Sequence, residues 1–157
     1  MKIGVFVDVS NLYYTISKKY GKRLNYQSYL NFIKDLGTVS IAQAYGAQTG
    51  KEARNFIYTL KKVGFTPKYK APKAYIDTLN PKKKADWDVG IAVDMIQTTL
   101  TTDIDTFILG SADSDLEPVV EWLKSRSKRV IVLATGISKE LYDSANQCIE
   151  IPESLLQ

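Results

Sequence analysis

Short apolar runs alternate along the chain with longer stretches that have the period of a helix. Strands are predicted at 2–8, 38–48, 105–111, 128–135 and 148–151, with a proline-interrupted edge strand at 65–76. Helices are predicted at 11–21, 26–37, 51–64, 86–100, 115–127 and 138–147, three of them closed by Gly21, Gly37 and Gly64. The first run, KIGVFVD, is apolar almost throughout, which is typical of a strand buried on both faces of a parallel sheet.

The alternation of strand and helix predicts an α/β fold with three layers, α/β/α, around a mainly parallel central sheet. The chain has 157 residues, the usual size of one domain, and contains no internal repeat, low-complexity segment or long linker. We therefore expect residues 1–157 to form a single domain with its own hydrophobic core.

Composition restricts the chemistry that is available. The chain has no histidine, which excludes imidazole acid–base catalysis and histidine metal sites, and its one cysteine, Cys148, cannot build a zinc site or an internal disulfide. An enzyme of this composition would use carboxylates, lysines, hydroxyls or a hard metal ion. The net charge of +4 permits an anionic partner.

We expect a cytoplasmic protein without a membrane anchor. The lone cysteine suggests a reducing compartment, and the apolar run at the N-terminus is too short for a signal peptide. No apolar stretch approaches the length that a transmembrane helix needs.

Aspartates follow the predicted strands and open a predicted helix. Asp8 ends the first strand, Asp113 and Asp115 follow the strand at 105–111, and Asp88 opens the helix before that strand. Because ligands of open parallel sheets bind beyond the carboxyl ends of the strands, we expect these four side chains to converge at one edge.

Each of these acids taken alone is more typical of a cap or a turn. Ser114 and Glu117 fit a capping box, so Asp115 could simply begin a helix, and Asp86 and Asp88 both suit the positive end of a helix dipole. Capping explains less well why acids recur at the same kind of position on successive elements. Converging carboxylates repel each other, and Mg²⁺ or Mn²⁺, which prefer oxygen ligands, would relieve that repulsion.

Two further polar residues lie beside these acids. Asp94 lies within the apolar stretch GIAVDMI and needs a partner there, which could be a metal or a backbone amide of a neighbouring loop. Asn11, three residues after Asp8, could orient a carboxylate or a metal-bound water, or could be an ordinary residue of a helix N-terminus.

Three segments in order, FVDVSNLYY (6–14), KADWDVGIAVDMI (84–96) and the segment 107–134 that begins FILGSADSDLEPVV, resemble the NYN domains. This family, also called the LabA or DUF88 group, belongs to the PIN-like nuclease superfamily. The family pattern of acids matches Asp8, Asp88, Asp113 and Asp115, with Asn11, Asp94 and Ser111 as supporting residues. The resemblance implies a PIN-like fold and metal-dependent cleavage of RNA in which the four acids are the catalytic metal ligands.

The chain departs from the family pattern at two positions of the last motif. Ala112 replaces the glycine that precedes the first acid of the turn, and Leu116 replaces the phenylalanine that follows the second. Neither change removes a ligand, but a positive φ at Ala112 would strain the turn.

A lysine-rich segment leads into the helix opened by Asp88. Its lysines suit a phosphate backbone, and its tyrosines could stack on bases, which makes the following residues candidate RNA contacts: Lys68, Lys70, Lys73, Lys82, Lys83, Lys84, Tyr69 and Tyr75. The alternative is a solvated loop whose lysines protect a sheet edge.

For four other aromatic residues, a role in packing competes with a role in stacking on bases. Tyr13 and Tyr14 are expected to pack into the core with polar tips, although one of them could reach a base. Trp87 could be a stacking surface or a lid over the helix start, and Trp122 has the spacing of a core residue.

The leading hypothesis is a ribonuclease that uses Mg²⁺ or Mn²⁺ to hydrolyse RNA phosphodiester bonds. The alternative is a non-catalytic RNA-binding or regulatory module on the same fold. A phosphohydrolase with an aspartate nucleophile fits poorly, because Ser10 occupies the place of its second acid. The resemblance also suggests a homodimer.

Overall fold

The computed structural model describes residues 1–47, 50–70, 73–74, 83–84 and 86–157. Its strands are β1 (Lys2–Asp8), β2 (Thr38–Ala47), β3 (Thr66–Lys70), β4 (Lys73–Ala74), β5 (Lys83–Lys84), β6 (Thr106–Gly110), β7 (Arg129–Ala134) and β8 (Gln147–Glu150). Its α-helices are α1 (Val9–Tyr20), α2 (Tyr26–Lys34), α3 (Gly50–Val63), α4 (Asp88–Thr101), α5 (Glu117–Ser125) and α6 (Lys139–Ser144). Two 3₁₀ turns, η1 (Ser114–Leu116) and η2 (Glu153–Leu155), complete the described elements.

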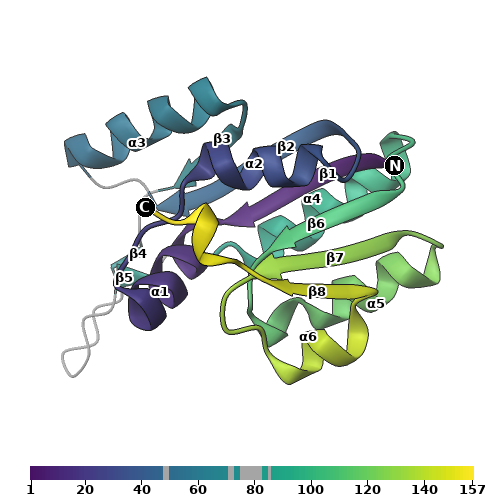
Figure 1. The fold of residues 1–157 in the computed structure, drawn as a ribbon. Coiled ribbons are helices and arrows are strands. Elements are labelled where there is room, and N and C mark those ends of the chain that lie inside the picture. The colour runs from purple at the N-terminus through teal and green to yellow at the C-terminus, as the bar shows by residue number, and fades with distance from the viewer. Residues whose placement is uncertain (48–49, 71–72, 75–82, 85) are drawn as a thin grey trace.

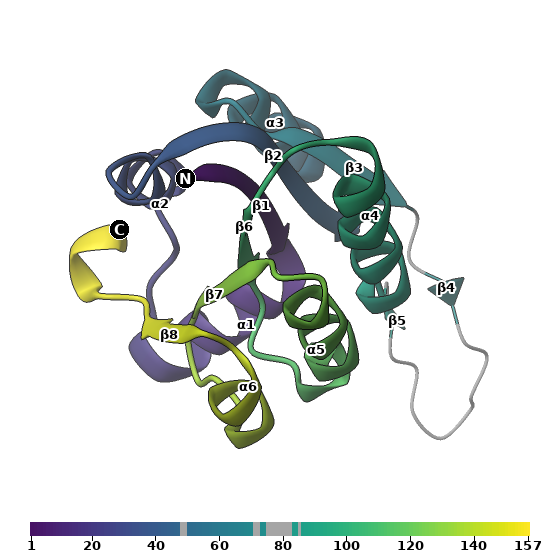
Figure 2. The same ribbon diagram turned by 90° about the vertical axis from the view of Figure 1, so that its right-hand side faces the viewer.

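Six parallel strands form the central sheet in the order β3-β2-β1-β6-β7-β8 (Figure 1). Helices α1 and α2 lie on one side of the sheet, and α4 and α5 lie on the other (Figure 2). The predicted three-layer α/β/α fold is therefore confirmed. The chain order reverses direction across the sheet between β1 and β6, so the carboxyl ends of these two central strands lie side by side.

The central strands are buried because their residues are apolar on both faces. Every residue of β6 and all but the first of β1 and β7 are buried. Phe6 of β1 stacks on Phe107 of β6, with ring centroids 5.8 Å apart. A charged side chain is costly inside such strands. Accordingly, Asp8 is the last residue of β1, and Asp113 and Asp115 lie beyond the end of β6.

The edge strand predicted at 65–76 is confirmed for its first half. β3 pairs only with β2 in the described residues, and Pro67 is tolerated because one side of the strand has no neighbour there. Trp122, predicted to be in the core, is half-buried and packs against it from α5.

Candidate metal centre

Three aspartates meet at the carboxyl edge of the sheet. Asp88 opens α4, and Asp113 and Asp115 follow β6, yet each offers a carboxylate oxygen within 4.8 Å of the others. Parallel β1 and β6 end at this edge, beside the start of α1 (Figure 1). The structure thus brings together three of the four acids that the sequence predicted as metal ligands.

Asp8 lies near these three acids, but among the described residues it is not one of those whose carboxylate oxygens lie within 4.8 Å of one another. It is the N-cap of α1, and its Oδ1 accepts a hydrogen bond from the backbone N–H of Asn11 over 3.1 Å. The pKa of Asp8 is raised to about 6, mainly by burial, with smaller contributions from the nearby charges of Asp113 and Asp86, while the hydrogen bond from Asn11 acts in the opposite direction. Asp8 is therefore a helix cap that lies close enough to Asp113 and Asp86 for their charges to raise its pKa.

The turn after β6 is held by side chains on both sides. Asn11 of α1 accepts a hydrogen bond through its Oδ1 from the backbone N–H of Ala112, over 3.0 Å. Buried Ser111 accepts another through its Oγ from the N–H of Asp113, over 3.2 Å. Asn11 and Ser111 thus fix the backbone that carries Asp113, whereas the sequence suggested that Asn11 orients a carboxylate or a water.

Asp113, not Asp115, is the cap of the turn that follows. Its Oδ1 accepts a hydrogen bond from the backbone N–H of Asp115 over 2.9 Å, and it is the N-cap of η1. Asp115 is exposed, with its carboxylate near Asp88 and Asp113. Asp115 itself lies in the first turn of η1, which leads directly into α5, so it also occupies the helix-start position that the sequence allowed.

The two departures from the family pattern leave the turn unstrained. Ser127 is the one non-glycine residue with a positive φ among the described residues, so Ala112 does not need a glycine's freedom. Leu116 is buried and keeps the packing role of the phenylalanine that it replaces.

The pKa of Asp88 is raised further than that of Asp8, the other acid at this edge with a raised pKa. Its pKa is raised to about 7, first by burial and then by Asp113, which both repels it and shares a hydrogen bond with it, with smaller effects from Asp86 and Asp8. Asp86 is a fifth acid that the sequence analysis treated only as a helix-start residue. Its Oδ1 accepts a hydrogen bond from the N–H of Asp88 over 2.9 Å, and the D-W-D spacing was the signal that could have identified it.

Asp94, two turns further along α4, has its partner in a lysine. Its Oδ2 accepts hydrogen bonds from Lys68 Nζ over 2.8 Å and from the hydroxyl of Tyr45 over 2.7 Å. This pairing satisfies the charge that the sequence left without a partner, in a way that the sequence analysis did not consider. It also means that Lys68, a predicted RNA contact, is neutralised by a partner within the protein.

The other described members of the lysine-rich segment also have internal contacts. Lys70 lies 4.3 Å from the centre of the Trp87 ring and donates a hydrogen bond to the backbone carbonyl of Asp86. The hydroxyl of Tyr69 is buried without a hydrogen-bond partner among the described residues, and its ring lies against Gly46. These positions favour a structural role for the start of the segment.

The remaining predicted RNA contacts are only partly described. Lys73 lies in β4, and Lys83 and Lys84 lie in β5, which pairs with β4 in an antiparallel ribbon. Tyr75 and Lys82 lie outside the described residues. Their contact with RNA stays a prediction.

Trp87 joins the start of α4 to the end of β2. Its Nε1–H donates a hydrogen bond to the carbonyl of Gly46 over 2.8 Å, and its ring packs against Tyr45 with centroids 5.3 Å apart. The side chain therefore fixes the backbone between Asp86 and Asp88.

The prediction that Tyr13 and Tyr14 pack into the core is wrong. Their side chains are 60% and 65% exposed, because Leu12 and Ile16 provide the buried face of α1. Both tyrosines lie within the first two turns after Asp8.

The residues of the acid cluster fit a hard divalent cation. Carboxylate oxygens are the ligands that Mg²⁺ and Mn²⁺ prefer, and three of them lie close enough to share one ion. The raised pKa of Asp88 shows that the cluster is unfavourable when fully ionised without a counter-charge.

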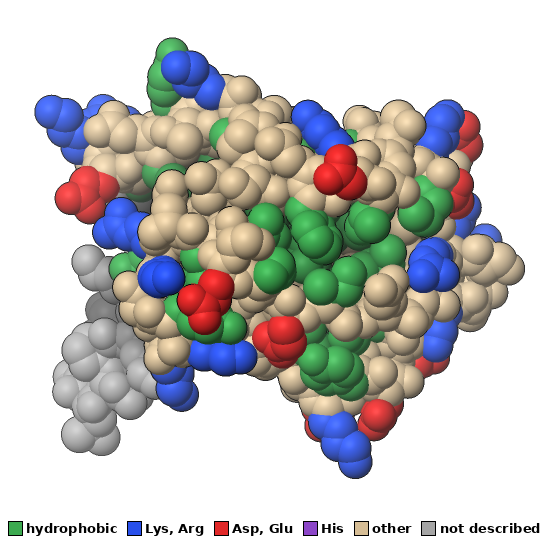
Figure 3. Space-filling model, viewed as in Figure 1, with side chains coloured by type: hydrophobic (Ala, Val, Ile, Leu, Met, Phe, Trp, Pro, Cys, Tyr) green, Lys and Arg blue, Asp and Glu red, His purple; other side chains and the backbone are tan. Residues whose placement is uncertain are grey.

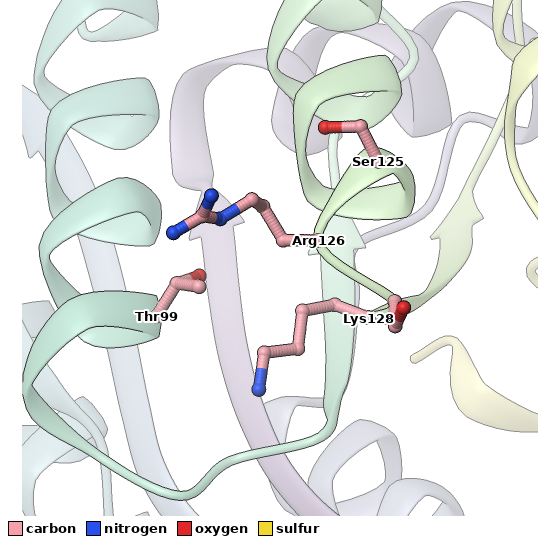
Figure 4. A pocket seen from close by; sticks show the side chains of 5 residues that line it. Thr99, Ser125, Arg126 and Lys128 are labelled. Carbon is pink, nitrogen blue, oxygen red and sulfur yellow. The ribbon is translucent and has the colours of Figure 1, made fainter.

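A shallow hollow of about 400 Å³ lies at the opposite edge of the sheet (Figure 4). Thr99 near the end of α4 and residues 125–128 before β7 line it, with Arg126 and Lys128 among them. It is therefore remote from the acids. On the face seen in Figure 3, lysine and arginine side chains are spread around the rim, so this face has no single dominant cationic patch in the described residues.

None of the helices in the described residues combines the length and apolar character that crossing a bilayer needs. The fold and the cluster together define a class of protein: an open α/β/α domain with a candidate metal centre of aspartates at the carboxyl edge of its parallel sheet. Residues 2–152 match the NYN domain family, and the chain belongs to this family of PIN-like nucleases.

Three individual proteins are similar to this chain, two of them over nearly its whole length. The chain is 25% identical to the Low amplitude and bright protein LabA of Synechococcus elongatus, over 96% of this chain and 83% of LabA. It is 28% identical to an uncharacterised protein of Methanocaldococcus jannaschii, over 77% of this chain but only 45% of that protein. The crystal structure of a protein of unknown function from Vibrio parahaemolyticus superposes with a TM-score of 0.86 at 32% identity, covering 99% of this chain and 96% of that one.

Proposed function

We propose that this protein is a metal-dependent ribonuclease that hydrolyses RNA phosphodiester bonds at the aspartate cluster. The observation that carries the proposal is the approach of Asp88, Asp113 and Asp115 to within 4.8 Å from two distant segments. These three side chains would hold Mg²⁺ or Mn²⁺, with Asp8 beside them as a further ligand, directly or through water. When bound, such an ion supplies positive charge for the phosphodiester and a nucleophile at neutral pH.

The protein's own groups position this centre. Asn11 and Ser111 hold the turn that carries Asp113, and Trp87 holds the backbone before Asp88. The composition supports this reading, because a chain without histidine leaves carboxylates to bind the metal and to accept protons.

RNA as the substrate is supported by membership of the family and by the net charge of the whole chain, which is +4 even with the acids of the centre included. The single cysteine fits a reducing compartment, and we place the activity in the cytoplasm.

A non-catalytic RNA-binding module is the second candidate. The observation in its favour is that Asp8 accepts the Asn11 N–H and lies outside the group of three acids in the described chain. Such a module would bind RNA but show no turnover with any divalent ion.

The decisive experiment is cleavage of RNA by the purified full chain with Mg²⁺, with Mn²⁺ and with a chelator. We expect cleavage only with a metal, and a loss of at least about a hundredfold in Asp113→Asn and Asp88→Asn. Asp143→Asn, an exposed acid on α6, is the matched control and should cleave like the wild type. Cleavage by Asp113→Asn at the wild-type rate would refute the site, whereas RNA binding without cleavage would support the second candidate.

A further inference from the structure

Helix α1 presents aromatic and cationic side chains to solvent and carries no acidic residue. Its sequence, VSNLYYTISKKY, includes Tyr14, which is 65% exposed, and the exposed Lys18 in its last turn. Tyr13, Tyr58 and Tyr142 are exposed as well, so exposure alone does not mark a site, and the direction in which Tyr14 points must decide. A ring next to a lysine, on a helix without negative charge, is complementary to a polyanion that also carries flat apolar groups.

One hydrogen bond shows which side of α1 is turned toward the acid cluster. Asn11 reaches the backbone of Ala112, in the turn that carries Asp113, so the side of α1 that bears Asn11 looks toward the acid cluster. Residues three and seven positions apart share a helical face, which places Tyr14 about 60° and Lys18 about 20° from Asn11 around the helix. Tyr14 and Lys18 thus continue the Asn11 side of the helix outward into solvent.

The positions of Tyr14 and Lys18 along the axis of α1 suit an RNA strand that extends away from the acid cluster. With a rise of 1.5 Å per residue, Tyr14 lies about 9 Å along the helix from Asp8, and Lys18 lies about 6 Å further. Helical side chains tilt toward the N-terminus, and the N-terminus of α1 is the end that adjoins the acids.

Tyr13 differs from Tyr14 mainly in the direction in which it projects from α1. It is exposed to nearly the same degree as Tyr14, but successive residues point 100° apart, so Tyr13 lies about 160° around the helix from Asn11. The two tyrosines therefore form a natural pair in which only one lies on the side that faces the acids.

We propose that Tyr14 and Lys18 form a subsite for an unpaired stretch of the RNA, in which a base stacks on the Tyr14 ring and Lys18 contacts a phosphate. This inference rests on the proposed function, because it concerns the strand that reaches the acid cluster. The subsite selects unpaired strands, since the faces of bases within a duplex are already stacked and not available to a side chain. It gives the protein a preference for single-stranded over double-stranded RNA without sequence readout.

The test compares tyrosine variants in binding to a short fluorescent oligoadenylate, measured by anisotropy with metal chelated. Stacking contributes about 1–3 kcal/mol per base, so we expect Tyr14→Ala to weaken binding about fivefold to a hundredfold. Tyr14→Phe should bind like the wild type because it keeps the ring. Tyr13→Ala should also bind like the wild type, and the same RNA annealed into a duplex should bind Tyr14→Ala and the wild type equally.

Three outcomes would overturn the proposal. Equal weakening by Tyr13→Ala and Tyr14→Ala would mean a general effect on α1, and unchanged binding by Tyr14→Ala would mean that the strand does not touch this face. In either case metal-dependent cleavage by the wild type would leave the proposed function intact. If the wild type neither binds nor cleaves RNA, both proposals fail.

Discussion

Asp88 shows how a single carboxyl group links the fold to its proposed metal. Its pKa is raised to about 7, and that of Asp8 to about 6, so both bind a proton in the folded protein at pH values where the unfolded chain has released it. Between about pH 4 and pH 7 the folded state therefore holds more protons than the unfolded state, and stability without metal must fall as the pH rises.

The first prediction follows from this fall in stability with rising pH. In the presence of a chelator, the melting temperature should decrease from pH 5 to pH 8, and Asp88→Asn should flatten the decrease because it removes the larger of the two shifts. Mn²⁺ should raise the melting temperature more at pH 8 than at pH 5, since protons compete with the ion for the same oxygens. Differential scanning fluorimetry measures all three, and a metal effect independent of pH would contradict the assignment.

Asn11 provides the second prediction at this scale. Asn11→Ala leaves the buried N–H of Ala112 without its acceptor, which should cost about 1–3 kcal/mol of stability in urea unfolding. Because the same turn carries Asp113, the affinity for Mn²⁺ should fall by about tenfold to a hundredfold in calorimetric titration. Asn31→Ala is the control: its exposed side chain bonds only that of Gln27 among the described residues, so neither quantity should change appreciably.

At the scale of elements, the sequence predicted the fold well because its signals are local. Apolar runs, glycines that end helices and acids at strand ends can each be recognised from a few neighbouring residues. The six strands of the main sheet lie where these patterns predicted them. The contacts between elements were harder. Nothing local to Asp94 or Lys68 indicates that β3 and α4 bring them together, and only the surroundings of α1 decide that Tyr14 faces solvent.

The start of α4 depends on such a contact and leads to the third prediction. The N-cap residue Trp87 makes no side-chain cap bond to α4, and the Asp86 carboxylate accepts the N–H of Asp88 instead. Trp87 holds this backbone in place by its bond to Gly46 and by its ring against Tyr45. Trp87→Phe keeps most of the ring contact and removes the hydrogen bond, so we expect about tenfold weaker Mn²⁺ binding by calorimetry. Trp122→Phe, the control on α5, should bind Mn²⁺ like the wild type.

The two tryptophans also allow a direct readout of this element. In Trp122→Phe, Trp87 is the one remaining tryptophan and lies next to Asp88. Paramagnetic Mn²⁺ bound at the acid cluster should therefore quench most of the fluorescence of that variant. In Trp87→Phe, the remaining Trp122 should be quenched much less. Equal quenching of both single-tryptophan proteins would place the ion elsewhere.

At the scale of the whole molecule, a net charge of +4 coexists with an edge crowded by acids. RNA must therefore be attracted by cations that lie outside that edge and are not already neutralised. Lys68 does not meet this condition, because Asp94 holds its ammonium group at 2.8 Å. Lys18 meets it better: it is exposed, and α1 carries no acid. The sequence does not distinguish a lysine that is paired within the protein, such as Lys68, from an exposed lysine such as Lys18, whereas the structure does.

The fourth prediction follows from this difference. For single-stranded RNA, each phosphate contact contributes about 0.7 to the slope of log affinity against log salt. Lys18→Ala should lower that slope by about this amount, whereas Lys68→Ala should leave it nearly unchanged. Lys68→Ala should instead lower the stability, because the half-buried Asp94 carboxylate then keeps only the Tyr45 hydroxyl as a hydrogen-bond partner among the described residues. Anisotropy titrations at several salt concentrations, with urea unfolding of the same variants, separate the two roles. A loss of salt dependence in Lys68→Ala at unchanged stability would show that its ion pair opens to receive RNA.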